Sequence, residues 1–192
     1  MSNAKNTTFT GHLFAGGLPL VINYQVMEQR LKHPRITTGQ RLSAEISLND
    51  EVASRIITLA DHDDAEPLLF EFVPDNQGRY TLGVKTVGRY FNWRLRMDQS
   101  SRHLLVDKNI GSYFELETYA GKLKSFGDLP SNPASVALVS VEKKLGLFQH
   151  ETKGGLKYFL DRNPNDTEHN AYNPVPVSFV LRTQPSALSA VA

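Results

Sequence analysis

The chain has 192 residues and no cysteine, and its 21 Lys and Arg residues nearly balance its 20 Asp and Glu residues. This length suits a single domain with a substantial core, and the absence of thiols excludes disulfides and thiolate metal sites. The balanced charge provides no strong field toward a polyanion, which argues against nucleic-acid binding. The first ten residues lack a secretory pattern, and no apolar stretch approaches the length of a transmembrane segment. These features predict a cytoplasmic protein by default, with export by a non-standard route left open.

Three short apolar strands are predicted in the first third of the chain, at residues 11–14, 57–60 and 70–72. Residues 25–50 form an insertion rich in polar residues, which we interpret as a surface loop because loops absorb changes in length at little entropic cost. One helical turn, capped by Asn49, is predicted over residues 48–54. The pattern predicts no long helix.

Strict alternation marks residues 80–97 as strands. Tyr80, Leu82 and Val84 alternate with polar residues or glycine, which is the period-two pattern of a half-buried strand. In the next strand, one face carries four apolar residues: Phe91, Trp93, Leu95 and Met97. Trp93 is therefore predicted to lie in the core rather than to stack against a sugar.

The last third of the chain is predicted to contain three further strands, at residues 121–124, 158–160 and 179–181. Two loops rich in turn-forming residues separate them, at 125–135 and 164–176. Residues 184–192 are small or polar and are predicted to form a flexible tail.

One pattern occurs three times along the chain. An apolar strand runs into an aspartate turn at three places: Asp61, Asp107 and Asp161. Such a unit needs its copies, because alone it does not bury its own apolar face. We therefore predict one domain over 1–192, built from three unequal repeats at approximately 9–75, 76–119 and 120–183. Equivalent apolar residues of the three repeats should all be buried: Leu59, Leu105 and Phe159.

Four segments of the middle third share the spacing of a known fold: Gly78-Arg-Tyr-Thr-Leu-Gly-Val84, Gly88-Arg-Tyr-Phe-Asn-Trp93, Leu104-Leu-Val-Asp107 and Tyr113-Phe-Glu-Leu116. Together they resemble one lobe of a β-trefoil of the fascin-like kind, over residues 78–117. The resemblance implies an all-β fold, the β-trefoil, in which a four-strand unit is repeated three times around a pseudo-threefold axis.

The resemblance leaves several functions open, because β-trefoils include lectins, actin-bundling proteins, cytokines, cysteine-free protease inhibitors and receptor-binding parts of toxins. The Gln-x-Trp signature of ricin-type lectins is missing, since the only tryptophan, Trp93, follows Phe91-Asn92. The leading prediction is a non-catalytic binding module, lectin-like or toxin-associated, that recognises a carbohydrate or a glycosylated surface. The alternatives are a protease inhibitor that presents loop 125–135 or 164–176, and an actin-bundling-type module with a protein partner.

One strand face is the predicted ligand-binding site, and it carries four polar or amphipathic residues: Tyr90, Asn92, Arg94 and Arg96. An aromatic ring, an amide and two guanidinium groups can grip an anionic or hydroxyl-rich ligand, because arginine offers a planar fork of donors. The competing interpretation is a solvated strand face with cross-strand partners.

A calcium site is a weaker hypothesis. Asp161, Asn163 and Asn165 provide oxygen ligands at alternating positions, as at the start of a calcium loop. The pattern then fails, because Asp166 replaces the required glycine and Tyr172 replaces the required glutamate. The alternative is an ordinary turn.

No catalytic motif is present, so we predict neither enzyme activity nor a cofactor. The remaining enzyme hypothesis is a hydrolase that uses Asp61, Asp63 and Asp64, which flank His62. A charged turn is the simpler interpretation. The three repeated aspartates are likewise interpreted as turn formers, because aspartate accepts hydrogen bonds from backbone amides two residues on.

Overall fold

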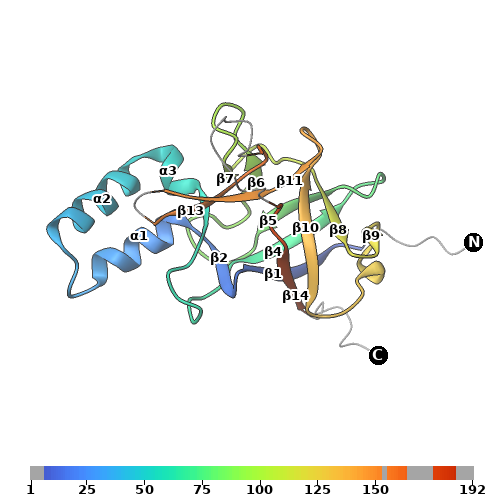
Figure 1. Ribbon diagram of the computed structural model, residues 1–192, viewed down its shortest axis with the longest axis horizontal. Coiled ribbons are helices and arrows are strands. Elements are labelled where there is room, and N and C mark those ends of the chain that lie inside the picture. Colours follow the sequence, from blue (N-terminus) through green and yellow to red (C-terminus); the bar gives the residue numbers. More distant parts are fainter. Residues whose placement is uncertain (1–6, 153–154, 164–174, 185–192) are drawn as a thin grey trace, which may run out of the picture.

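The computed structural model describes residues 7–152, 155–163 and 175–184 (Figure 1). The strands are β1 (Phe9–Ala15), β2 (Leu18–Ile22), β3 (Ile57–Leu59), β4 (Leu69–Pro74), β5 (Tyr80–Val84), β6 (Arg94–Met97), β7 (Leu104–Asp107), β8 (Phe114–Thr118), β9 (Gly121–Lys122), β10 (Ala134–Ser140), β11 (Leu145–Gly146), β12 (Phe148–Glu151), β13 (Lys157–Leu160) and β14 (Phe179–Gln184). The helices are α1 (Asn23–Lys32), α2 (Thr38–Asn49), α3 (Glu51–Arg55) and the short 3₁₀ helix η1 (Phe126–Asp128). None of the helices in these described ranges has both the length and the apolar character needed to span a membrane.

Six strands close into an antiparallel barrel. β1 pairs with β4 and β14, β5 pairs with β4 and β8, and β10 pairs with β8 and β14. Alternate residues of these strands point inward, and the largest are aromatic: Phe9, Phe70, Phe72, Tyr80, Phe114 and Phe179. Because the ring closes, each barrel strand has a neighbour on both sides. The predicted all-β class is confirmed, with the barrel at its centre.

A strand pair lies between successive barrel strands at three places in the chain. β2 and β3 come between β1 and β4, β6 and β7 come between β5 and β8, and β12 and β13 come between β10 and β14. Three residue pairs join the strand pairs to one another: Thr58 with Tyr158, Ile56 with Leu105, and His103 with Leu160. The burial prediction for the repeats is confirmed, because Leu59, Leu105 and Phe159 are 5%, 3% and 0% exposed.

The insertion at 25–50 is helical, so its interpretation as a loop is wrong. In Figure 1, α1, α2 and α3 lie together on one side of the barrel. They bury a small second apolar cluster, formed by Val21, Val26, Met27, Ala44 and Ala60. In α2 only Ala44 is fully buried. Two of its larger apolar residues, Leu42 and Ile46, are exposed, so the apolar period that identifies a buried helix face in a sequence is largely missing.

Capping residues determine where the later helices begin. The Thr37 hydroxyl accepts a hydrogen bond from the Gln40 backbone N–H, and the Gln40 side chain accepts one from the Thr37 N–H. This capping box starts α2. The short helix α3 is capped by Asp50, which accepts bonds from two backbone amides. The predicted cap, Asn49, is instead the last residue of α2.

The strand predicted from residue 90 begins only at Arg94. Backbone hydrogen bonds from Phe91 to Gly88 and from Trp93 to Tyr90 fold the preceding residues into a turn. The turn breaks the predicted alternation, so Phe91 is 46% exposed whereas Tyr90 is 5% exposed. Trp93 is half-buried and packs against the main core, in line with its predicted position.

The predicted tail at 184–192 begins with Gln184, which is the last residue of β14. Residues 185–192 lie outside the described residues.

Candidate functional site

Three residues on neighbouring strands form the centre of the candidate site. Glu71 on β4 is in register with Gly83 on β5, and Gly83 is in register with Arg94 on β6. Their neighbours along each strand are buried in the barrel, so these three residues face outward. A Cβ atom placed on Gly83 would have only the Trp93 carbonyl oxygen, at 4.0 Å, within contact range. A position with no side chain therefore lies between a carboxylate and a guanidinium group.

Lys85 connects Glu71 to Asn92, which lies in the turn before β6. Its Nζ lies 3.0 Å from a carboxylate oxygen of Glu71 and 3.0 Å from the amide oxygen of Asn92. The same ammonium group lies 5.9 Å from the centre of the Phe91 ring. Asn92 has a φ of +64°, a left-handed conformation that asparagine tolerates better than most residues. These contacts bring the exposed Phe91 ring beside Lys85. We call Glu71, Gly83, Lys85, Phe91, Asn92 and Arg94 the Gly83 surface.

Arg94 is the exposed cation of the Gly83 surface. Its aliphatic part lies against Gly111, where an added Cβ would come within 3.0 Å of the Arg94 Cβ. The missing side chain at Gly111 thus makes room for Arg94. Among the described residues, the guanidinium group of Arg94 forms no ion pair. Its donors are free to bind a ligand.

The structure separates the four residues predicted to form one face. Asn92 and Arg94 belong to the Gly83 surface. Tyr90 does not, because it is buried edge-on against Trp93 with a distance of 4.9 Å between ring centres. The predicted inclusion of Tyr90 in an exposed strand face is wrong because this residue lies in the turn before β6 and not in the strand.

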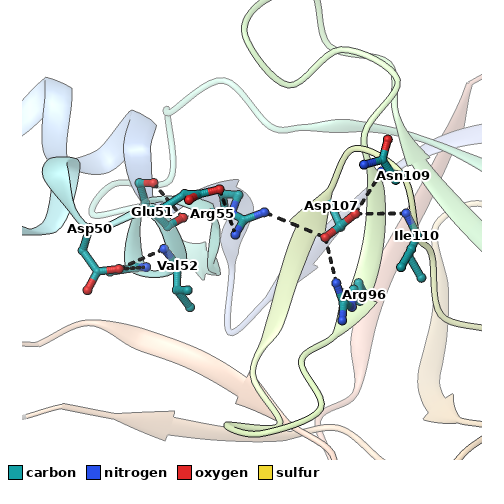
Figure 2. Close-up of polar contacts among 10 residues, drawn as sticks. Asp50, Glu51, Val52, Arg55, Arg96, Asp107, Asn109 and Ile110 are labelled. Atoms are coloured by element: carbon teal, nitrogen blue, oxygen red, sulfur yellow. Dashed lines mark hydrogen bonds and ion pairs between the residues drawn. The ribbon is translucent and has the colours of Figure 1, made fainter.

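Arg96 lies on β6 but serves an ion pair. Figure 2 shows its guanidinium directed at Asp107, 2.8 Å away, with Arg55 approaching the same carboxylate at 3.8 Å. Burial by itself raises the pKa of Asp107, but hydrogen bonds from two backbone N–H groups and from Arg96 lower it more. The pKa of Asp107 therefore lies below its usual range. This aspartate both forms a turn and fixes Arg96.

The other two repeated aspartates are also paired with arginines. Asp61 accepts two hydrogen bonds from Arg30, both at 2.7 Å, and Asp161 accepts two from Arg102. The predicted turn role holds for Asp107, because its carboxylate accepts hydrogen bonds from the backbone N–H groups of Asn109 and Ile110. Sequence spacing did not reveal the arginines, because each comes from a distant segment.

The calcium hypothesis gains no support from the described part of the chain. Asp161 is engaged by Arg102, and Asn165 lies outside the described residues. Asn163 is among the described residues, and the described ranges contain no group of three or more His, Asp or Glu side chains that could hold a metal ion.

The proposed hydrolase residues follow β3. Asp61 is held by Arg30, whereas Asp63 and Asp64 are exposed. Asp63 lines a hollow of about 370 Å³ together with Gly16 and Gly17. In the described residues, no hydrogen bond connects these carboxylates to a group that would activate a nucleophile.

Sequence reasoning missed Glu71, Gly83, Lys85 and Phe91 as members of a site. Their proximity depends on which strands pair and in what register, and no local pattern encodes that. Comparison of the chain with protein-family models, with curated proteins and with solved structures found no match. The Gly83 surface must therefore be interpreted from its own chemistry.

That chemistry suits a ligand with hydroxyl or acidic groups. Glu71 is an acceptor, Arg94 is a donor, and the Asn92 amide can do both. The Phe91 ring offers an apolar face beside them.

Proposed function

We propose that the chain is a β-trefoil that binds carbohydrate through the Gly83 surface. Its strand order supports the trefoil. Each third of the barrel follows the same sequence: a barrel strand, an inserted strand pair, and a second barrel strand. Contacts between the three strand pairs support a pseudo-threefold arrangement.

The observation that carries the binding function is the open position at Gly83 between Glu71 and Arg94. A pyranose presents hydroxyl groups around its edge and C–H groups on its face. Carboxylate, amide and guanidinium groups match the edge, and an exposed aromatic ring matches the face. Phe91, which is 46% exposed, takes the stacking role, whereas Trp93 is partly buried against the main core.

The charge of the surface favours an acidic glycan. Glu71 and Lys85 form an ion pair with each other, so their charges largely cancel. Arg94 then contributes an uncompensated positive charge. A carboxylated or sulfated sugar would accept a bidentate pair of hydrogen bonds from it.

A glycan array probed with the parent chain tests this function. We expect saturable binding to acidic glycans, weakened about tenfold or more by Gly83→Val. Valine would fill the open position, and its preference for strands favours the fold. Arg94→Ala should have a similar effect on binding, whereas Arg41→Ala, a matched change of an exposed arginine on α2, should have none.

The proposal fails if the array gives no signal, or if Gly83→Val binds as tightly as the parent. With a blank array, inhibition in a protease panel would favour the inhibitor function. Co-sedimentation with actin filaments would favour the bundling function.

A further inference from the structure

A concave site that shares no residue with the Gly83 surface lies between α1, α2 and the residues after β3. It is a cavity of about 780 Å³. Its walls come from α1, from the α1–α2 connection, from the first half of α2 and from the residues that follow β3. The buried side chains of Met27 and Ala44 contribute apolar surface to it. This volume lies in the range of sites that enclose small organic ligands.

The charges that line the cavity do not cancel. Among the described residues, Asp61 is the only carboxylate that lines the cavity, and the Nε and Nη2 atoms of Arg30 each donate a 2.7 Å hydrogen bond to it. This pair is neutral as a unit. Arg35 also lines the cavity, and among the described residues its guanidinium forms no ion pair. In the described part of the chain, Arg35 thus brings an unpaired positive charge to the cavity lining.

Two uncharged polar side chains of the lining, His33 and Gln40, are oriented as donors by local hydrogen bonds. The Arg35 backbone N–H donates to Nδ1 of His33, so the neutral ring carries its proton on Nε2. The side-chain oxygen of Gln40 accepts from the Thr37 N–H and hydroxyl, which leaves the Gln40 NH₂ group to donate. Together with the Arg35 guanidinium, these two side chains form a group of three donors.

We propose that this cavity binds a small organic anion, whose carboxylate or phosphate group meets Arg35, His33 and Gln40 and whose apolar part lies on Met27 and Ala44. A ligand that brings acceptors and negative charge satisfies these three donors. A neutral or cationic ligand leaves Arg35 uncompensated. The Arg30–Asp61 pair fixes one wall, because a bidentate arginine–carboxylate pair has a defined geometry.

Gly39 supplies a clean test, because it lines the cavity and an added Cβ there would meet no atom within 4 Å. Gly39→Leu would place an apolar side chain in the open space beside Gly39 while introducing a better helix former in α2. Arg35→Ala removes the charge alone. Arg41→Ala is the matched control, because Arg41 is an exposed arginine of α2 outside the lining.

Calorimetric titration with phenyl phosphate and phenylacetate distinguishes the two acidic groups, and benzyl alcohol serves as the neutral analogue. At constant ionic strength we expect one of the anions to bind and benzyl alcohol to bind at least about tenfold more weakly. Arg35→Ala should weaken anion binding about tenfold, Gly39→Leu should abolish it, and Arg41→Ala should leave it unchanged. Melting temperatures of all variants verify folding.

Amide chemical shifts locate the bound anion. Shifts at residues 33–44 support the proposal, and shifts confined to the Gly83 surface overturn it without affecting the carbohydrate function. The proposal is also overturned if neither anion binds, if benzyl alcohol binds equally well, or if Arg35→Ala retains the parent affinity.

Discussion

Arg102 holds Asp161 by two hydrogen bonds, one of which joins Nε to Oδ1 at 2.8 Å. The Asp161 side chain is 0% exposed and that of Arg102 is 11% exposed. Arg102 lies in the turn between β6 and β7, and Asp161 directly follows β13. The ion pair therefore fastens the second inserted strand pair to the third, at the end of the barrel where all three meet.

Asp161→Asn should destabilise the fold by about 3–5 kcal/mol, because it removes the buried partner of the largely buried Arg102 charge. Denaturant unfolding measures the loss. Glu142 also contacts Arg102, but its side chain is 58% exposed. Glu142→Gln should therefore change stability by less than about 1 kcal/mol. Equal effects of the two substitutions would contradict a structural role for Asp161.

Truncation of Phe159 or Leu105 should be costly, because each is buried where the inserted strand pairs pack. We expect Phe159→Ala to lower the free energy of unfolding by about 3–5 kcal/mol and Leu105→Ala by about 2–5 kcal/mol. Phe91→Ala is a useful comparison on the same chain, because that ring is 46% exposed. A loss for Phe159→Ala no greater than that for Phe91→Ala would argue against the shared core.

Acidification should weaken the fold through two histidines that flank Tyr158. The ring centres of His103 and His150 lie 4.7 and 5.7 Å from that of Tyr158. Burial lowers the pKa of both histidines, so the folded state takes up their protons less readily than the unfolded chain. The stability is complete above a pH of about 6.5 and falls as the pH drops through the lower folded pKa values.

A His103→Gln/His150→Gln double variant tests this origin. Its melting temperature should fall less than that of the parent between pH 7.5 and pH 5. The two proteins are compared first at pH 8, where both histidines are neutral. Parallel curves on acidification would assign the pH dependence to other groups.

Tyr80 should respond to alkali. Its side chain is fully buried, and its hydroxyl has no hydrogen-bond partner among the described residues. Burial, with a smaller effect of Asp128, raises the pKa of Tyr80 to about 12. The unfolded chain loses this proton near pH 10, so the contribution to stability is complete below that pH and is lost as the pH rises toward 12.

Tyr80→Phe should therefore unfold less readily than the parent above pH 10. At pH 7 its stability should be equal to or up to about 1 kcal/mol above that of the parent, because the change removes an unpaired buried hydroxyl. Thermal unfolding at both pH values measures the effect. A marked loss at pH 7 would reveal a partner for the hydroxyl.

Local patterns were sufficient for the barrel strands but not for the helices or the site. Tyr80, Leu82 and Val84 alternate strictly and are buried as expected. In α2, by contrast, Leu42 and Ile46 are exposed, so the apolar residues of this helix do not mark its buried side. Here capping groups and packing against α1 decide the structure, and a count of apolar residues does not detect them.

The Gly83 surface was only half predictable for a related reason. Side-chain chemistry alone predicts Asn92 and Arg94 as site residues. Glu71 and Gly83 joined them because of strand register, which depends on pairing between distant segments. The error at Tyr90 arose from extending a period of two through a turn, where a few local backbone hydrogen bonds change the direction of every side chain.

The two ends of the helical insertion, residues 23–55, lie next to each other. The Asn23 backbone N–H donates a 2.8 Å hydrogen bond to the carbonyl of Ile56, beside the last residue pair of β2 and β3, Ile22 with Ile57. Because the ends are held together, the entropic cost of closing the segment between them depends only weakly on its length. Residues 23–55 could thus be replaced by a tight turn or by another helical hairpin while β2 and β3 keep their register. By such a replacement, evolution or a designer can exchange the cavity and retain the barrel.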